Sequence, residues 1–271
     1  MPATEPQGIA KAASNTIPLM STTQVHQSDI EAGLHTVGLG HGDLVFVHSS
    51  LSAFGHVVGG ADTVIDALLA VVGSEGTAVV PTFTWDRFHD ERGAVFNIAN
   101  TPSEVGAITE TFRLRPDARR SSHICHSVAA IGPKAEAVMG DGVRPFGKGS
   151  TFEQLVRLDS WYLFLGVGFE VCTALHHVEE MQQVPYRYYR DFRESVVVFP
   201  DGRRRPSRAV EYLRRDGYRN DLARAGPVLA DAGVLRTTEV GDATVTNIRM
   251  RDIIEIIGRR VETDPYFLVT R

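Results

Sequence analysis

Short apolar runs and amphipathic segments alternate along the chain. Largely apolar runs at residues 44–47 and 77–80 are each followed by polar positions, which is typical of buried strands that end at the edge of a core. The apolar positions between these runs recur with the 3.6-residue period of an α-helix: Val64, Ile65, Leu68, Leu69 and Val72. This order of strand, helix and strand predicts a layered α/β fold.

The same alternation continues to the end of the chain. Further elements are expected as a helix at 28–37, a turn at 40–42, strands at 162–165 and 195–199, and a last helix at 250–261. Ser150 and Glu153 have the spacing of a capping box, which predicts a helix that runs through Leu158. Asp264 and Pro265 are expected to end the last helix.

The start of the chain differs in composition from the rest. Residues 1–24 are rich in Ala, Ser, Thr, Pro and Gln and show no periodicity, so they lack the apolar surface needed for a core. Downstream we find no repeats and no linker-like segment. We therefore expect a disordered tail at 1–24 and a single domain at 25–271.

Charge and cysteine content narrow the function classes. The formal net charge of −5 argues against a general binder of nucleic acid, because such proteins gain affinity from a basic face. Two cysteines, Cys125 and Cys172, are too few for a disulfide framework in 271 residues, which favours a reducing compartment. Since neither an apolar run of about 18 residues nor a signal-peptide pattern occurs, we expect a soluble cytoplasmic protein.

Residues 203–219 are rich in arginine, although the net charge of the whole chain is negative. They also contain Pro206, Tyr212 and Tyr218, a mixture that can be mistaken for a nucleic-acid patch. Because charge runs mostly face water, we interpret the stretch as a solvated helix face with loop arginines. Contact with the phosphates of a nucleotide cofactor is the alternative.

Three segments carry side chains suited to binding or catalysis, and the first is residues 48–63. It lies between the first strand and the following helix and is rich in serine and glycine. Ligands of α/β sheets bind at such strand ends, and free backbone N–H groups at a helix start suit phosphate oxygens. The segment has neither a Walker sequence nor a G-x-G-x-x-G motif, so an ordinary tight loop is the competing interpretation.

The second segment, residues 120–132, combines His123, Cys125 and His126. Imidazole and thiolate are natural zinc ligands, so a metal site is one interpretation. The segment continues into an apolar strand, in which side chains three positions apart point to opposite faces. That geometry disfavours a metal shared by the two histidines.

The third segment, residues 166–180, follows a buried strand and enters a helix. His176 and Glu179 are three positions apart, hence neighbours on one helical face, and His177 and Glu180 form a second such pair one position round. A carboxylate can orient an imidazole and favour its cationic form, an arrangement suited to a general base. A simple surface contact is the alternative.

Taken together, the three segments resemble the aminoglycoside 3-N-acetyltransferases. Residues 47–63 match the family pattern V-H-x-S-L-x-x-x-G-x-V-x-G-G-A-x-T, and residues 76–86 match its G-T strand and the loop after it. The second and third segments match R-S-x-H-P-x-x-S-x-x-A-x-G and L-L-L-G-x-x-x-x-x-x-T-x-L-H-x-x-E. The resemblance extends in order from Ser28 to Phe267.

The resemblance implies a layered α/β/α domain with a central mixed sheet. It implies direct acetyl transfer from acetyl-coenzyme A to an aminoglycoside, at the 3-amino group of the 2-deoxystreptamine ring, which confers resistance. The implied base is His176, oriented by Glu179, with His123 shaping the same pocket. The implied coenzyme contacts are His48, Ser49, Ser50, Leu51, Ser52, Phe54, Gly55, Val57, Gly59, Gly60, Thr63 and Ser127. Acidic residues implied for the ammonium groups of the acceptor are Asp86, Glu170 and Glu180.

Some positions depart from the family patterns near the expected acceptor pocket. Ile124 replaces a proline, and Cys125, Glu170 and Cys172 also stand where the family carries other residues. The departures bear on the acceptor and leave the transfer reaction intact, so acylation of another amine is one alternative. A second alternative is a metal-dependent hydrolase that uses His123, His126, His176 and Glu179. A serine hydrolase is disfavoured, since no G-x-S-x-G elbow occurs.

The partners expected on this interpretation are few. They are coenzyme A and a small cationic amine, with a homodimer as the expected assembly. We expect no metal, nucleic acid or membrane partner. A binding protein that keeps the fold without turnover is the non-catalytic alternative.

Overall fold

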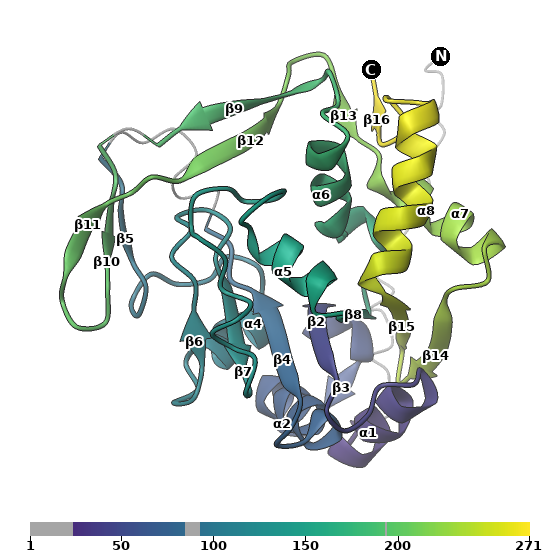
Figure 1. Cartoon of the computed structure of the whole chain (residues 1–271). Helices are drawn as coiled ribbons and strands as arrows, with labels where there is room; N and C mark the ends of the chain where they lie inside the picture. Colours follow the sequence, from purple (N-terminus) through teal and green to yellow (C-terminus); the bar gives the residue numbers. More distant parts are fainter. Residues whose placement is uncertain (1–23, 85–92, 193) are drawn as a thin grey trace, which may run out of the picture.

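The computed structural model describes residues 24–84, 93–192 and 194–271 (Figure 1). Its centre is a mixed sheet of seven strands in the order β14-β15-β8-β2-β4-β7-β6. The strands are β2 (Leu44–Ser49), β4 (Thr77–Pro81), β6 (Arg119–Arg120), β7 (Val128–Ile131), β8 (Trp161–Leu165), β14 (Arg236–Val240) and β15 (Ala243–Arg249). β2 pairs in parallel with β4 and β8, and antiparallel strands extend the sheet on both sides.

Helices cover both faces of this sheet. One face packs against α5 (Thr151–Arg157), α6 (Ala174–Met181) and α8 (Met250–Thr263), and the other against α1 (Gln27–Thr36), α2 (Gly60–Val72) and α4 (Ala107–Arg113). Along β2, Phe46 belongs to the first core and Val45 and Val47 to the second, as the two-residue period of a strand requires. The expected layered α/β/α fold with a central mixed sheet is confirmed.

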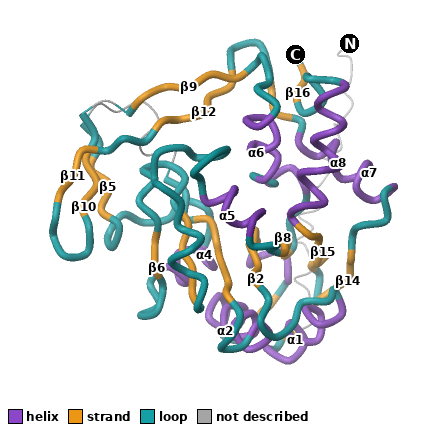
Figure 2. The backbone as a smooth tube through the Cα atoms, in the orientation of Figure 1, coloured by secondary structure: helices purple, strands orange, loops and turns teal. Residues whose placement is uncertain are grey.

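Two small sheets project to one side, and we call them the arm. The arm contains β5 (Val95–Asn97), β9 (Arg187–Asp191), β10 (Val196–Val198), β11 (Arg204–Pro206) and β12 (Val210–Arg214). β9 pairs with β12, and β10 lies between β5 and β11. Figure 2 shows these strands extending away from the helices. They surround a small core that includes Phe96, Cys125 and Phe192.

Short pairings complete the described fold. β1 (Gln24–Val25) pairs in parallel with β3 (His56–Val57), and β13 (Arg219–Asn220) pairs with β16 (Val269–Thr270) beside α8; α7 (Ala225–Asp231) follows β13 along the chain. Gln24, which is expected in the tail, therefore takes part in a strand. Residues 1–23 lie outside the described residues. None of the described helices is long and apolar enough to cross a membrane.

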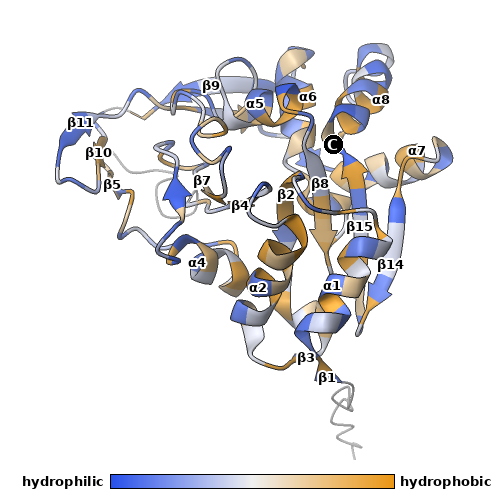
Figure 3. Cartoon of the chain, turned by 60° about the horizontal axis from the view of Figure 1, so that its bottom comes forward, coloured by the Kyte–Doolittle hydropathy of each residue, from blue (hydrophilic) through white to orange (hydrophobic). Residues whose placement is uncertain are grey.

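Most expected elements occur where the apolar pattern places them. Ser150 caps α5 by accepting a bond from the Glu153 amide at 3.3 Å, and the Glu153 carboxylate accepts from the amide of Gly149 at 2.8 Å. The helix face expected within 203–219 was wrong, because that stretch forms β11 and β12. Pairing with β9 and β10 satisfies its backbone, and β11 stays hydrophilic at the tip of the arm (Figure 3).

Candidate active site

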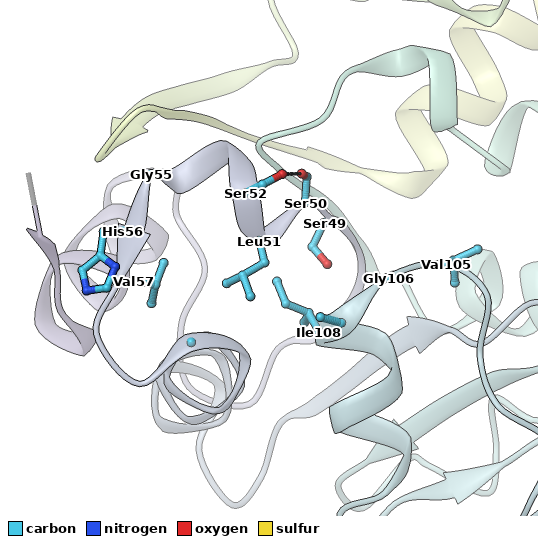
Figure 4. A pocket seen from close by; sticks show the side chains of 12 residues that line it. Ser49, Ser50, Leu51, Ser52, Gly55, His56, Val57, Val105, Gly106 and Ile108 are labelled. Carbon is cyan, nitrogen blue, oxygen red and sulfur yellow. Dashed lines mark hydrogen bonds between the residues drawn. The ribbon is translucent and has the colours of Figure 1, made fainter. Parts of the chain in front are cut away.

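The carboxyl end of β2 opens into a pocket of about 630 Å³ (Figure 4). Its walls are the short helix η1 (Leu51–Phe54), β3 and the start of α4, with Leu51 and Ile108 facing each other. The lining residues are Ser49, Ser50, Leu51, Ser52, Gly55, His56, Val57, Gly60, Val105, Gly106, Ala107 and Ile108. Serine hydroxyls beside apolar side chains suit a ligand that has both polar and apolar parts.

Two glycines stand at the start of α2, and the second of them, Gly60, lines this pocket. Gly59 and Gly60, at the start of α2, have φ values of 85° and 65°, a left-handed conformation that favours glycine. A Cβ on Gly59 would lie 2.3 Å from Oγ1 of Thr63, whereas one on Gly60 would meet nothing within 4 Å. The Thr63 hydroxyl donates to the Val58 carbonyl at 2.6 Å and so holds the loop in shape.

The expected coenzyme contacts divide between the pocket and its supports. Those that line the pocket are Ser49, Ser50, Leu51, Ser52, Gly55, Val57 and Gly60. Those that do not line it are His48, Phe54, Gly59, Thr63 and Ser127. Phe54 is buried in the core, and the Ser127 hydroxyl donates to the Thr82 carbonyl at 2.8 Å and lies 3.1 Å from Nε of Arg120. Sequence reasoning missed His56, which stands at an unspecified position of the first motif, and residues 105–108, which belong to none of the motifs.

α6 places His176 beside Glu179. Their Nδ1 and Oε2 atoms are 2.6 Å apart, and the Glu179 side chain is fully buried. Oε1 of Glu179 accepts a bond from the Tyr186 hydroxyl at 2.8 Å, and Oε2 lies 2.6 Å from Nε of Arg187. The His176 ring packs on Phe146 at 5.3 Å between centroids, and Nε2 makes no hydrogen bond to a described residue. One ring nitrogen is therefore held, and the other can meet a ligand.

The charges around this pair favour an ionised carboxylate and a neutral imidazole. Burial acts to raise the pKa of Glu179, but contacts with His176, Arg187 and Tyr186 hold that pKa below its usual value. Burial, and then the charge of Arg187, lower the pKa of His176 against the opposing effect of Glu179. At neutral pH the imidazole thus keeps a lone pair on Nε2 while Nδ1 donates to the carboxylate.

Thr173 joins the pocket side of the sheet to α6. Its hydroxyl lies 3.0 Å from Nε2 of His48, at the end of β2, and 3.1 Å from the hydroxyl of Tyr162 on β8. Burial lowers the pKa of His48 to about 3, so this imidazole is neutral in the contact. The network fixes the first turn of α6, and hence His176, relative to the strand that ends at the pocket.

His123 stabilises a turn through hydrogen bonds at both ring nitrogens. Its Nδ1 accepts bonds from the amides of Cys125 and His126 at 3.2 and 3.0 Å, and its Nε2 donates to the Val210 carbonyl at 3.1 Å. Both ring nitrogens are occupied, and burial lowers the pKa of His123 to about 4. The expectation that His123 and His126 point to opposite faces was wrong: their rings are 5.5 Å apart, because β7 begins only at Val128.

The described residues offer the hydrolase alternative no ligand set. Within 24–84, 93–192 and 194–271, no group of three or more His, Cys, Asp or Glu side chains is arranged to hold a metal ion. Cys125 and Cys172 are both buried. Burial raises the pKa of each thiol, to about 12 for Cys172, so neither forms a thiolate at neutral pH.

The acidic candidates lie in different surroundings. Glu170 is exposed, accepts a bond from the Gly168 amide at 2.9 Å and lines a second hollow of about 440 Å³ together with Asp242. Glu180 is 3.1 Å from Nη1 of Arg144 and is therefore already paired. Asp86 lies outside the described residues.

The second histidine–glutamate pair expected on α6 is not formed. Nδ1 of His177 accepts a bond from the Gly147 amide at 3.0 Å, and Glu180 pairs with Arg144. The loop that contains Arg144 and Gly147 packs against this face of α6 and supplies both partners. Of the two expected pairs, His176–Glu179 is the one that the described residues form.

Comparison with known proteins places the chain in a family. Residues 46–262 match a family model described as aminoglycoside 3-N-acetyltransferase. The chain is 30% identical over 259 residues to aminoglycoside N(3)-acetyltransferase VII of Streptomyces paromomycinus, a match that covers 85% of this chain and 89% of that protein.

Solved structures give the same result. The apoenzyme of aminoglycoside acetyltransferase AAC(3)-IVa superposes with a TM-score of 0.77 and 26% identity, covering 91% of this chain and 92% of that one. A mutant of that enzyme in complex with apramycin gives 0.76 and 26%, covering 91% and 96%. AAC-IIIb in a binary complex with CoASH, at 24% identity, TM-score 0.78 and coverage of 89% and 97%, shares the fold. With the family match extending over most of the described fold, the chain belongs to the aminoglycoside 3-N-acetyltransferase family of enzymes.

Proposed function

We propose that this protein transfers the acetyl group of acetyl-coenzyme A to the 3-amino group of the 2-deoxystreptamine ring of an aminoglycoside, and so confers resistance. The observation that carries the proposal is the His176–Glu179 pair, whose helix is tied through Thr173 to the strand that ends at the serine- and glycine-lined pocket. Relatives solved with apramycin and with CoASH support the choice of the two substrates.

The pocket at the end of β2 is the proposed coenzyme site. The hydroxyls of Ser50 and Ser52 and the backbone at Gly60 would meet polar groups of pantetheine and phosphate. Leu51 and Ile108 would cover the apolar carbons between them. His48 does not line this pocket and supports it indirectly, through its hydrogen bond with Thr173.

His176 is the proposed general base. An acceptor ammonium must lose a proton before its nitrogen can attack the thioester carbonyl, and Nε2 of a neutral imidazole can accept that proton. The nitrogen then bonds to the carbonyl carbon and loses its second proton to water, and the tetrahedral adduct collapses by breaking the carbon–sulfur bond. The proton held on Nε2 can pass to the departing thiolate, and Glu179 stabilises the imidazolium in between.

Glu170 is the proposed contact for an ammonium group of the acceptor, since it is exposed and its carboxylate has no cationic partner among the described residues. Glu180 contributes less to binding of the acceptor, because its charge is already paired with that of Arg144. Asp86 stays a candidate from its sequence alone. A cytoplasmic homodimer whose subunit has one domain at 25–271 completes the proposal.

A thiol-release assay tests the function. Purified protein is mixed with acetyl-coenzyme A and a panel of aminoglycosides and unrelated amines, and turnover is expected with aminoglycosides. His176→Ala should reduce kcat on the order of a hundredfold or more and leave coenzyme affinity unchanged. His41→Ala, which removes an exposed imidazole, serves as the matched control.

Two outcomes would contradict this proposal. Turnover with another amine and none with aminoglycosides would reject the acceptor. Near-wild-type turnover by folded His176→Ala would reject the base.

A further inference from the structure

We propose that Arg187 is a positioning residue for acetyl transfer, which clamps the Glu179 carboxylate and keeps His176 unprotonated so that it can act as a base. The inference rests on the proposed role of His176. It concerns a side chain that comes from β9, in the arm, and not from the helix of the His–Glu pair.

The guanidinium of Arg187 lies against both members of the pair. Its Nε is 2.6 Å from Oε2 of Glu179, and its Nη2 is 3.0 Å from Nδ1 of His176. The same Nη2 donates to Oδ1 of Asn220 at 3.0 Å, and Nη1 donates to the Tyr212 carbonyl at 3.4 Å. A planar fork with several donors can hold these positions at once, which a lysine ammonium cannot.

Aromatic rings and burial keep this guanidinium in place. Its Cζ lies 5.5 Å from the ring centroid of Tyr212 and 6.0 Å from that of Tyr186. The Arg187 side chain is only 5% exposed. Burying a cation is costly unless it is paired, and here the paired carboxylate is the one that also holds the proposed base.

The distances decide where the proton of the imidazole lies. Nδ1 of His176 cannot donate to Glu179 and accept from Arg187 at the same time. The contact with Oε2 is shorter than the contact with Nη2, at 2.6 against 3.0 Å, so the proton belongs on Nδ1 and points to the carboxylate. Arg187 therefore acts on the imidazole through its charge, and Nε2 is left as the basic nitrogen.

The positive charge of Arg187 opposes the effect of the Glu179 carboxylate on the pKa of His176. A histidine paired only with a buried carboxylate holds its proton to higher pH, and an imidazolium cannot accept the proton of an acceptor amine. Arg187 works against this, together with Arg214 of β12 and with burial. His126 also lies near enough for its charge to couple to that of His176. Of the three groups that oppose the carboxylate, Arg187, Arg214 and His126, Arg187 is the one with a contact to Nδ1.

An NMR titration of the imidazole tests the inference without any turnover. The ring signals of His176, assigned by their loss in His176→Gln, are followed against pH in the full chain. In the wild type we expect the Nδ1–H tautomer and a pKa below about 6.5, the ordinary value for histidine. Arg187→Gln should raise that pKa by roughly one unit, because removal of a cation at contact distance favours the imidazolium.

Kinetics and control variants separate this role from a merely structural one. The acid limb of kcat/KM should move to higher pH by the same amount in Arg187→Gln, with most of the lost rate recovered above the new pKa. Arg187→Lys keeps the charge and should restore the pKa while recovering kcat only in part. Arg215→Gln removes an exposed cation that stacks on Tyr188 and donates to the Pro185 carbonyl, and it should shift nothing.

The outcomes distinguish this inference from the proposed function. A folded Arg187→Gln protein with an unchanged His176 pKa would overturn the inference. If that variant does not fold, a wild-type His176 pKa above its ordinary value would overturn it equally. Failure of the wild type to acetylate any aminoglycoside, with the titration behaving as expected, would instead reject the proposed acceptor.

Discussion

Tyr186→Phe removes one hydroxyl from the base site and leaves everything else in place. Tyr186 is 1% exposed, and its hydroxyl donates to Oε1 of Glu179 at 2.8 Å. The ring stays packed against Tyr218 and Tyr266, each 5.7 Å away between centroids, so the change opens no large cavity. The lost bond is therefore the main effect.

The expected loss of stability follows from the negative charge of Glu179, which accepts this hydrogen bond. A hydrogen bond to an ionised group contributes about 1.5–3 kcal/mol to the free energy of unfolding. For a domain of this size each kcal/mol corresponds to about 2–4 °C, so Tm at neutral pH should fall by about 3–12 °C. Because Arg187 and His176 still hold the carboxylate, kcat should fall less than about tenfold.

The bond from Tyr186 to Glu179 also predicts how the loss of stability in Tyr186→Phe depends on pH. It helps to depress the pKa of Glu179, and a depressed carboxyl pKa contributes stability that is present above the unfolded pKa. That stability is lost as pH falls through the folded pKa of Glu179. The difference in Tm between the wild type and Tyr186→Phe should therefore be full at neutral pH and vanish in acid.

Calorimetry on a double-mutant cycle measures this interaction. Tyr186→Phe is compared in the wild type and in Glu179→Gln, and its cost should be clearly smaller where the carboxylate is absent. Tyr188→Phe removes a hydroxyl from an exposed tyrosine and controls for the substitution itself. An equal cost in both backgrounds, or no cost in the wild type, would refute the reasoning.

Three further predictions concern the coenzyme pocket, a thiol and a helix cap. Gly60→Val should weaken coenzyme affinity by on the order of tenfold, measured by titration calorimetry, because a side chain at φ 65° is strained and projects at the pocket lining; unchanged affinity would place the coenzyme elsewhere. Mass spectrometry after mixing with acetyl-coenzyme A alone should find no acetyl group on Cys125, whose buried thiol has a raised pKa, and a stoichiometric adduct would contradict this. Ser150→Ala should lower stability by about 1 kcal/mol in denaturant unfolding and leave kcat unchanged, since it removes the cap of α5 and the bond that the same hydroxyl donates to the Gly147 carbonyl; an unchanged midpoint would mean that these bonds contribute nothing.

Local periodicity was enough to predict the centre of the fold. β2, α2 and α8 bury complete apolar faces, so their spacing in the sequence carries the information. The contact between His176 and Glu179 was equally predictable, because both lie on one helix at a fixed separation.

The remaining parts depend on contacts between distant segments. β12 has only five residues, its buried positions do not alternate with exposed ones, and Glu211 and Arg214 are charged, so its pairing with β9 left little trace in the pattern. Arg187 contacts the His176–Glu179 pair from β9, and no sequence motif marks this residue. Ile108 likewise meets the coenzyme loop only through packing of α4 on α2.

The pairing of β1 with β3 bears on how the protein is handled in the laboratory. Gln24 and Val25 run alongside His56 and Val57, both of which line the pocket at the end of β2, and the Val58 amide donates to the Val25 carbonyl at 2.9 Å. The chain thus enters the described domain along the outside of a pocket wall, whereas the C-terminal strand β16 pairs with β13. An affinity tag is better fused after Arg271, and a truncation that passes Gln24 strips support from the wall itself.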